Sequence, residues 1–434
     1  MQNMTATDNQ RLRSGEGDAV TLSVEERSVR SNDSEAPTRI AIVASHAVQY
    51  FTPYFRALAG TPGVVLKVFF CRKWGAETYF DRDFKTEVKW DIPLLDGYEW
   101  EFLESRHEGE SLSFWAMDNP NVGEALKRFQ PEVVEIHGYS YRTMWRALRW
   151  CNANQVPAIL FSDSNGAAKT PIWKRAVKAV IVGKFYRRLD GALSCGDNNR
   201  VYHLRYGIPQ ERVYPRPQPI DCRRYLASVG DAAAARLEIR KLHGIPEDAF
   251  VVVFAGKLSE VKCPLHLLQA VRLCGQRGLN VWGLFVGEGA LRPALEAYLA
   301  EHAMKNAVLA GFVNQSRIGK YYAASEVVTL MSSYEPKGQT VPEAGVVGCP
   351  AILSDRIGCI GPNDCARPGE NALVYPWADI NAFADCIARV YKDRQLYRSM
   401  SEAAVRIATL QDVVLAAQQM KDAAVQLKKI GCRR

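Results

Sequence analysis

The chain has 434 residues, of which 47% are apolar and 24% are charged. This length exceeds what one ordinary hydrophobic core needs, and the composition is that of a water-soluble globular protein, so two domains are expected. Residues 1–37 carry four basic and seven acidic groups, which leaves 51 basic and 40 acidic groups in the remainder. That positive balance suits an anionic ligand such as a nucleotide diphosphate, a nucleic acid or an acidic lipid surface.

The eleven cysteines are odd in number and scattered, and none forms a CxxC pair. This usage is typical of reduced thiols in a cytoplasmic protein. Residues 1–37 lack an apolar core of signal-peptide length, and no stretch approaches the ~18 uncharged apolar residues of a membrane span. We therefore expect a cytoplasmic location.

Residues 1–37 are rich in polar and charged side chains and are predicted to be a disordered tail. From Arg39 onwards, short apolar runs alternate with helical or loop segments. This alternation predicts a parallel sheet covered by helices on both faces, as in a Rossmann-like domain over residues 38–220. The runs are IAIVAS, VVLKVFFC, VVEIHG, PAILFSDS and GALSCG.

Three prolines in five residues, PRPQP at 215–219, interrupt the alternation, and we expect a linker over residues 221–248 that includes an Ala/Arg-rich helix. A second alternating series then predicts another Rossmann-like domain over residues 249–400. Residues 401–434 have a helical pattern and are interpreted as a C-terminal helix that can return to the first domain. The predicted class is α/β with two doubly wound domains.

The strongest chemical signal is SSYEPKGQTVPEAGVVGCP at residues 332–350, which follows the apolar run VVTLM. Ligands of doubly wound sheets bind beyond the carboxyl ends of the strands, where this segment falls. Gly338 would let the backbone approach a phosphate or sugar. Glu335 would accept hydrogen bonds from sugar hydroxyls, and Glu343 would chelate the paired hydroxyls of a ribose. The alternative is an ordinary strand–helix connection with solvated acids.

Two lysines flank an earlier strand–helix turn in FAGKLSEVKCPLHLL. Lys257 ends the strand and Lys262 precedes the helix, so the two cations could grip both phosphates of a diphosphate without a metal. A solvated loop is the alternative. Between the two motifs, Gly287 and Glu288 in VGEG follow another strand and open a helix.

The order GKLxxxK, VGEG, GFV, ExxxxxxxE and GCP resembles the donor domain of retaining glycosyltransferases of family 4, which have the GT-B architecture of two Rossmann-like domains facing a cleft. The resemblance covers roughly residues 38–400, and ASHAVQYFTPYFRAL is similar to the start of bacterial members that build surface polysaccharides. It implies that the lysines contact the donor diphosphate and that Glu335 and Glu343 contact donor sugar and ribose. Lys257 replaces the usual arginine, and Pro336 replaces a common glycine.

In the first domain, His137 follows the buried run VVEI. The resemblance implies that His137 contacts the donor sugar or the charge that develops in the transition state; a purely structural histidine is the alternative. His46 and Gln49 in the first loop, and Asp163 and Asn165 in FSDSN, are candidate acceptor contacts, although turn chemistry also selects Asp and Asn.

Neither a metal nor a cofactor is expected, since the nucleotide-diphosphate sugar is itself the substrate. An Asp-x-Asp pattern at residues 81–83 lies outside the donor domain and is interpreted as surface. Residues 173–188 carry six basic side chains and no acid, so this segment could contact an anionic membrane at its inner face, a simple surface helix being the alternative. The basic residues form no nucleic-acid-binding module.

Taken together, the residues and the resemblance predict a hexosyltransferase-type, metal-independent retaining glycosyltransferase. It would move a sugar from a nucleotide-diphosphate donor to a glycan or lipid-linked acceptor, and the resemblance implies a role in bacterial surface or exopolysaccharide biosynthesis. A nucleotide-sugar epimerase or a phosphorylase on the same scaffold is one alternative. A non-catalytic GT-B scaffold at the membrane surface is another.

Overall fold

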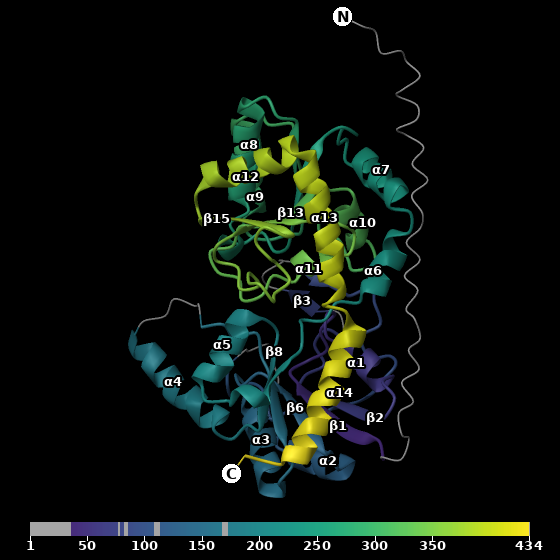
Figure 1. Ribbon diagram of the computed structural model, residues 1–434, viewed down its shortest axis with the longest axis vertical. Helices are drawn as coiled ribbons and strands as arrows, with labels where there is room; N and C mark the ends of the chain where they lie inside the picture. Colours follow the sequence, from purple (N-terminus) through teal and green to yellow (C-terminus); the bar gives the residue numbers. More distant parts are fainter. Residues whose placement is uncertain (1–35, 77–78, 82–85, 108–112, 167–171, 434) are drawn as a thin grey trace, which may run out of the picture. The chain divides into compact units, whose positions relative to one another are not determined.

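The computed structural model describes residues 36–76, 79–81, 86–107, 113–166 and 172–433, and the chain from Pro37 onwards forms one compact unit. Two parallel sheets flanked by helices lie within these residues (Figure 1). The predicted α/β class with two doubly wound domains is confirmed. The disorder expected for residues 1–37 falls almost wholly outside the described residues.

The first sheet has the strand order β5-β2-β1-β6-β7-β8-β9, and all of its pairs are parallel. Its central strands bury both faces, with Ile40 to Val43 fully buried, which is why they read as continuous apolar runs. The strands are β1 (Thr38–Ala44), β2 (Val64–Phe70), β5 (Glu99–Phe102), β6 (Val133–His137), β7 (Ala158–Phe161), β8 (Gly191–Ser194) and β9 (Val213–Pro215), and the helices are α1 (Thr52–Ala59), α2 (Val122–Phe129), α3 (Arg142–Asn154), α4 (Ile172–Tyr186) and α5 (Asp197–Arg205). A separate antiparallel pair joins β3 (Tyr79–Asp81) and β4 (Thr86–Val88).

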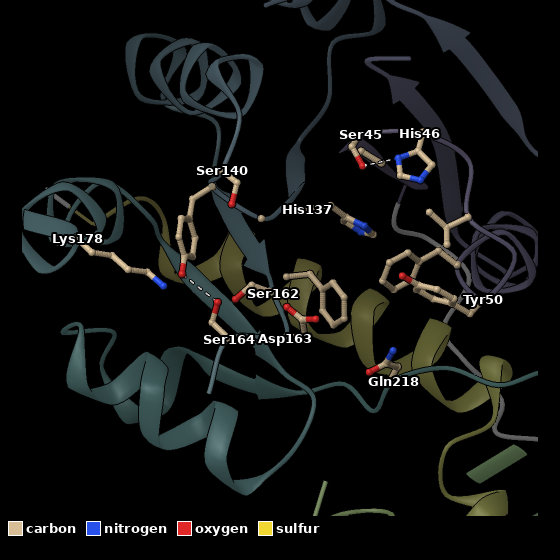
Figure 2. Close-up of a pocket in the computed structure, with 16 residues that line it drawn as sticks. Ser45, His46, Tyr50, His137, Ser140, Ser162, Asp163, Ser164, Lys178 and Gln218 are labelled. Carbon is tan, nitrogen blue, oxygen red and sulfur yellow. Dashed lines mark hydrogen bonds between the residues drawn. The ribbon is translucent and has the colours of Figure 1, made fainter. Parts of the chain in front are cut away.

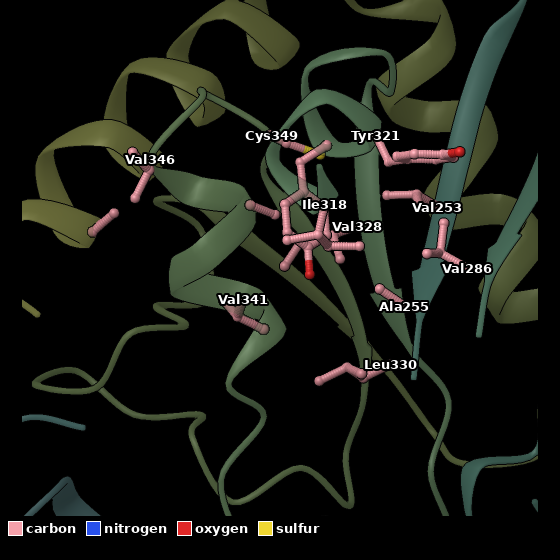
Figure 3. Packing of buried hydrophobic residues seen from close by; sticks show 14 of the residues in the cluster. Val253, Ala255, Val286, Ile318, Tyr321, Val328, Leu330, Val341, Val346 and Cys349 are labelled. Atoms are coloured by element: carbon pink, nitrogen blue, oxygen red, sulfur yellow. The ribbon is translucent and has the colours of Figure 1, made fainter. Parts of the chain in front are cut away.

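The second sheet has the order β12-β11-β10-β13-β14-β15 and is also parallel throughout. On one face, Val253 and Val328 pack against Ile318 and Val341 from the covering helices (Figure 3). The strands are β10 (Phe250–Ala255), β11 (Val281–Val286), β12 (Ala307–Gly311), β13 (Val327–Leu330), β14 (Ala351–Ser354) and β15 (Ala372–Tyr375), and the helices are α8 (Leu265–Gln276), α9 (Arg292–Glu301), α10 (Ile318–Ala323), α11 (Thr340–Gly345) and α12 (Ile380–Lys392).

The stretch 221–248, which is expected to be a linker with an Ala/Arg-rich helix, is helical over most of its length. This stretch forms helices α6 (Cys222–Val229) and α7 (Ala232–Leu242), which pack against α10. Each begins at an aspartate whose side chain accepts a hydrogen bond from the first turn, an arrangement that favours a helix start. Tyr225 and Ile239 lie in the core of the second domain, so the segment belongs to that domain.

The C-terminal segment contains two helices in succession. Helix α13 (Arg394–Thr409) packs against α11 and α12, whereas α14 (Val413–Ile430) packs against α1 and β1 (yellow in Figure 1). The chain returns to the first domain beside its outward path: Ile220 N donates to Gln411 O and Val413 N donates to Ile220 O, both at 2.9 Å. Two adjacent, hydrogen-bonded segments therefore connect the domains.

The strand order reverses between β1 and β6 in the first sheet and between β10 and β13 in the second. Loops on either side of such a reversal run in opposite directions and leave a crevice at the carboxyl ends of the strands. The residues predicted to carry function follow these strands or their neighbours.

Candidate functional site

A pocket of about 360 Å³ lies at the carboxyl ends of β1, β6 and β7. Figure 2 shows His137, Asp163 and Gln218 among the side chains around it. The side chains that line it are mostly polar or aromatic, which suits a hydroxylated ligand such as a sugar. The lining includes Ser45, His46, Tyr50, Phe51, His137, Tyr139, Ser140, Phe161, Ser162, Asp163, Ser164, Lys178 and Gln218.

His137 is the last residue of β6 and lies above a buried ionic network. Its Nε2 is 2.7 Å from Glu135 Oε1, and the guanidinium of Arg216 lies 3.0 Å from the same oxygen. The hydroxyl of Tyr54 donates to Glu135 Oε2 at 2.8 Å. Glu135 and Arg216 were missed in the sequence, although a glutamate in the middle of the apolar run VVEIH is a signal of a buried partner.

The network determines the charge on each member. Burial alone would raise the pKa of Glu135, but Arg216 and His137 hold it below its usual range, so the carboxylate is ionised. Burial lowers the pKa of His137, and the attraction of Glu135 offsets this only in part. At neutral pH the wall of the pocket therefore carries a neutral imidazole above a paired carboxylate.

The other first-domain candidates do not share one pocket. His46 and Asp163 line the pocket with His137; burial lowers the pKa of His46 to about 4. The enclosing walls and then the Glu335 carboxylate raise the pKa of Asp163, which places Asp163 and Glu335 within electrostatic reach of each other. Asn165 Nδ2 donates to the backbone oxygen of Pro336 at 3.2 Å, so this residue holds the second-domain loop.

A second pocket of about 220 Å³ lies at the switch point of the second sheet. Gln49 belongs to this pocket and thus reaches it from the first domain. The turns after β10 and β11 form one side and the start of α11 forms another. The lining comprises Gln49, Tyr50, Trp90, Ala255, Gly256, Val286, Gly287, Phe312, Val313, Gln315, Ile318, Tyr322, Gln339, Thr340 and Glu343.

Glu343 is buried in the first turn of α11 at the edge of this pocket. Burial raises the pKa of its carboxyl, and hydrogen bonds from Tyr225 and Tyr322 offset the shift in part. The Tyr322 hydroxyl lies 3.0 Å from Glu343 Oε2. The two tyrosines therefore hold the carboxyl in one orientation toward the pocket.

The predicted lysines and the first predicted glutamate lie on neighbouring loops. Lys262, at the end of a short 3-10 turn (η2, Glu260–Lys262), forms an ion pair with Glu335. Lys257 lies in the turn directly after β10 and is half-buried. Two groups that were expected to contact different parts of one ligand are thus paired with each other in this structure.

Close packing explains why Gly287 and Gly338 carry no side chain. A Cβ on Gly287 would lie 1.9 Å from the backbone oxygen of Gly256, so a side chain there would separate the turns after β10 and β11. Gly338 has a φ of +85°, and a Cβ would lie 2.9 Å from Leu330. Glu288 is paired with Arg292 at 2.6 Å within its own domain.

A buried lysine that the sequence reasoning did not single out connects the two domains. Lys337 Nζ lies 2.8 Å from Asp364 Oδ1 and also donates to the backbone oxygen of Cys195 in the first domain. The other oxygen of Asp364 accepts from Asp197 N at 2.9 Å. This ion pair therefore links the loop that carries Glu335 to the end of β8.

Within the described ranges, no group of three or more His, Cys, Asp or Glu side chains is arranged to hold a metal. None of the helices in these ranges is both long and apolar enough to cross a membrane. The predicted basic segment forms α4, with Lys178, Val180 and Ile181 exposed; its side chains before Lys178 lie outside the description.

Residues 235–406 match the family described as glycosyl transferases group 1. The alpha-D-kanosaminyltransferase of Streptomyces kanamyceticus is 26% identical over 280 residues, which is 63% of this chain and 64% of that protein. The lipopolysaccharide core biosynthesis glycosyltransferase LpsE of Rhizobium meliloti is 30% identical over 158 residues, which is 36% of this chain and 44% of that protein. The chain thus spans less than two thirds of these relatives.

Among solved structures, HepE of Anabaena in complex with UDP superposes with a TM-score of 0.69 and 16% identity, covering 90% of this chain and 100% of that chain. Likeness at this identity shows the fold. The chain therefore has the GT-B architecture of two Rossmann-like domains, and its second domain carries the match to glycosyl transferases group 1.

Proposed function

We propose that the protein is a glycosyltransferase that moves a sugar, with retention of anomeric configuration, from a nucleotide-diphosphate donor to a glycan or lipid-linked acceptor. The observation that carries this proposal is the second-domain pocket, where Glu343 and the glycine turns meet Gln49 and Tyr50 from the first domain. The family match over residues 235–406 supports the same activity. The complex of HepE with UDP supports the choice of a nucleotide donor.

In this proposal the donor lies across the switch point of the second sheet. Lys257 and Lys262 bind the diphosphate, Glu343 binds the ribose hydroxyls, and Glu335 binds the sugar. Since Lys262 is paired with Glu335, donor binding would draw the ammonium toward phosphate and release the carboxylate for sugar hydroxyls. The ion pair would thus keep both groups in place until the donor arrives.

The reaction breaks the bond between the anomeric carbon and the diphosphate oxygen and forms a bond from that carbon to the acceptor oxygen on the same face. The acceptor proton passes to an oxygen of the leaving phosphate. The lysines stabilise the negative charge that builds up on the diphosphate, so the step uses neither a metal nor a covalent intermediate. His137 would meet the donor sugar from the first domain, and Asp163, His46 and Asn165 would position the acceptor.

We place the reaction at the cytoplasmic face of a membrane, in the biosynthesis of a bacterial surface polysaccharide. The name of LpsE, a lipopolysaccharide core biosynthesis glycosyltransferase, supports the role in surface polysaccharide biosynthesis. Exposed Val180 and Ile181 beside Lys178 on α4 support peripheral contact with anionic lipid.

The test is a binding and turnover screen of the full chain against uridine-, guanosine- and adenosine-diphosphate sugars with chelator present. One donor is expected to bind and to be slowly hydrolysed, and NMR coupling constants of the transfer product should report the anomeric configuration of the donor. Glu343→Ala should abolish binding, whereas Glu301→Ala, at the exposed end of α9, should not. An epimerised donor or phosphate-dependent cleavage would replace the proposal with an epimerase or a phosphorylase, and no binding would favour a scaffold.

A further inference from the structure

The Glu135 carboxylate determines which nitrogen of His137 carries the proton. An ionised carboxylate only accepts hydrogen bonds, and Glu135 Oε1 lies 2.7 Å from Nε2 of His137. Nε2 is therefore the protonated nitrogen. Because the ring is neutral, Nδ1 keeps a lone pair and can only accept.

The Nδ1 side of the ring is the side left for a ligand. The imidazole lines the first-domain pocket, and no hydrogen bond recorded among the described residues reaches Nδ1. Phe51 and Phe161 pack around the ring, with centroids 4.9 and 5.3 Å from that of the imidazole. These aromatic contacts restrict rotation of the ring, so that the lone pair has one direction.

Arg216 holds the carboxylate in its ionised state. Its guanidinium is fully buried between the rings of Tyr54 and Phe161, 4.3 and 3.7 Å from their centroids. Its charge is neutralised by Glu135 at 3.0 Å, so the pocket wall does not gain a free cation from it. Five other titratable side chains line the first-domain pocket: His46, Tyr50, Tyr139, Asp163 and Lys178.

We propose that Glu135 and Arg216 are positioning residues that make His137 an obligate hydrogen-bond acceptor, so that the sugar bound in this pocket must present a hydroxyl proton to Nδ1. The inference rests on the proposed function and names the sugar class: a donor with a hydroxyl at the position that meets His137. A sugar that is deoxygenated at that position loses the bond. A uronic acid that presents its carboxylate there is repelled by the lone pair.

The tautomer can be measured without activity, from the long-range ¹H–¹⁵N spectrum of the ¹⁵N-labelled full chain, with His137→Asn assigning the signals. The wild type is expected to show the neutral Nε2–H form. E135Q keeps an acceptor oxygen and should keep that form, as should Y54F, which alters the contact on Oε2 only. The double variant E135L/R216M replaces the buried pair by apolar groups, which the fold tolerates more readily than a single loss, and should give a mixture of tautomers. An Nδ1–H form in the wild type overturns the inference.

The second arm compares donor affinities, using the nucleotide found in the screen, for the parent hexose, its monodeoxy analogues and its uronic acid. The wild type, E135Q and Y54F should reject one monodeoxy analogue and the uronic acid by at least about 10-fold. In E135L/R216M the preference should shrink to less than about 3-fold. A wild type that binds all donors equally overturns the inference and leaves the glycosyltransferase intact, whereas a wild type that binds none removes the proposed function and leaves the tautomer to be judged by NMR.

Discussion

The two pockets occupy the same topological position in two similar sheets, yet different kinds of residue line them. The first-domain pocket is lined by hydrogen-bonding side chains, and the buried Glu135–Arg216 pair beneath them sets the chemistry of this lining. The second-domain pocket has glycine turns and the buried Glu343 carboxyl, so its chemistry comes from close approach of the backbone and from that carboxyl. The shared strand order fixes where a ligand can lie, whereas the residues beneath each loop fix what it can be.

The largest expected effect concerns the ion pair that joins the two regions. Asp364→Ala leaves the buried Lys337 ammonium without its carboxylate, and the free energy of unfolding should fall by about 3–5 kcal/mol. Urea denaturation measures this. Asp385→Ala removes the partner of Arg277 in an exposed pair and should cost less than about 1 kcal/mol. Equal losses in the two variants would show that Lys337 does not depend on Asp364.

The next effect concerns the positive charge of Lys262, which follows β10 and is paired with Glu335. Lys262→Ala should lower kcat for transfer by about 10²–10³, the loss typical of one missing group that stabilises a developing anion. Lys262→Arg should recover most of the rate because it keeps the charge. Lys305→Ala, an exposed lysine before the amino end of β12, serves as the control and should change kcat by less than about 2-fold. A full rate for Lys262→Ala would assign the diphosphate to other groups.

Glu343 should make donor binding in the second pocket depend on pH. Burial raises the pKa of Glu343, and ribose binding needs the carboxylate, so donor affinity should rise with pH through that raised pKa. Stability runs the opposite way: the folded state holds the proton more tightly, so this group's contribution to the free energy of unfolding declines as pH rises from the unfolded pKa to the folded one. Calorimetry across pH measures the affinity.

The matched variant for that titration is Glu343→Gln. It should bind the donor about 10- to 100-fold more weakly at high pH, because the amide cannot chelate two hydroxyls as acceptor, and its affinity should not vary over the same pH range. A wild-type slope that persists in Glu343→Gln would assign the titration to another group.

The smallest expected effect tests the contact of the first domain with the donor loop. Asn165→Ala removes the hydrogen bond to the Pro336 oxygen and should weaken donor binding by about 0.5–1.5 kcal/mol. Asn152→Ala removes a similar bond, to the Arg188 oxygen at 3.0 Å within the first domain, and should leave donor affinity unchanged. Equal affinities in the two variants would show that this cross-domain contact does not shape the loop.

Both faces of each sheet are covered, so most positions of the central strands are buried and apolar, as Ile40 and Val253 are. Sequence periodicity predicted these strands for that reason. It missed β5, whose residues EWEF alternate between charged and aromatic, and β9, which is only three residues long. The prolines at 215–219 predict a linker, and helices α6 and α7 follow them, because an aspartate cap and an apolar face favour a helix whatever the composition of the preceding turn.

The candidate site was predictable as a set of loops and not as a set of contacts. Glu335, Glu343 and the two lysines follow strand ends, which sequence reveals. The pairing of Lys262 with Glu335 joins residues 73 positions apart and depends on the path of two turns. Glu135 differs, because a lone charge in an apolar run indicates that a buried partner exists but not that this partner is Arg216, 81 positions away.

The double connection at Ile220 and Gln411–Val413 has a mechanical consequence. A single connection would allow the two domains to rotate about several axes. Two segments that are hydrogen-bonded side by side resist twisting and leave bending across the pair as the easier motion. Opening by this bending changes the width of the gap while the lateral alignment of the two switch points is retained. The protein would then admit and release large molecules while the residues at the two switch points stay aligned with each other.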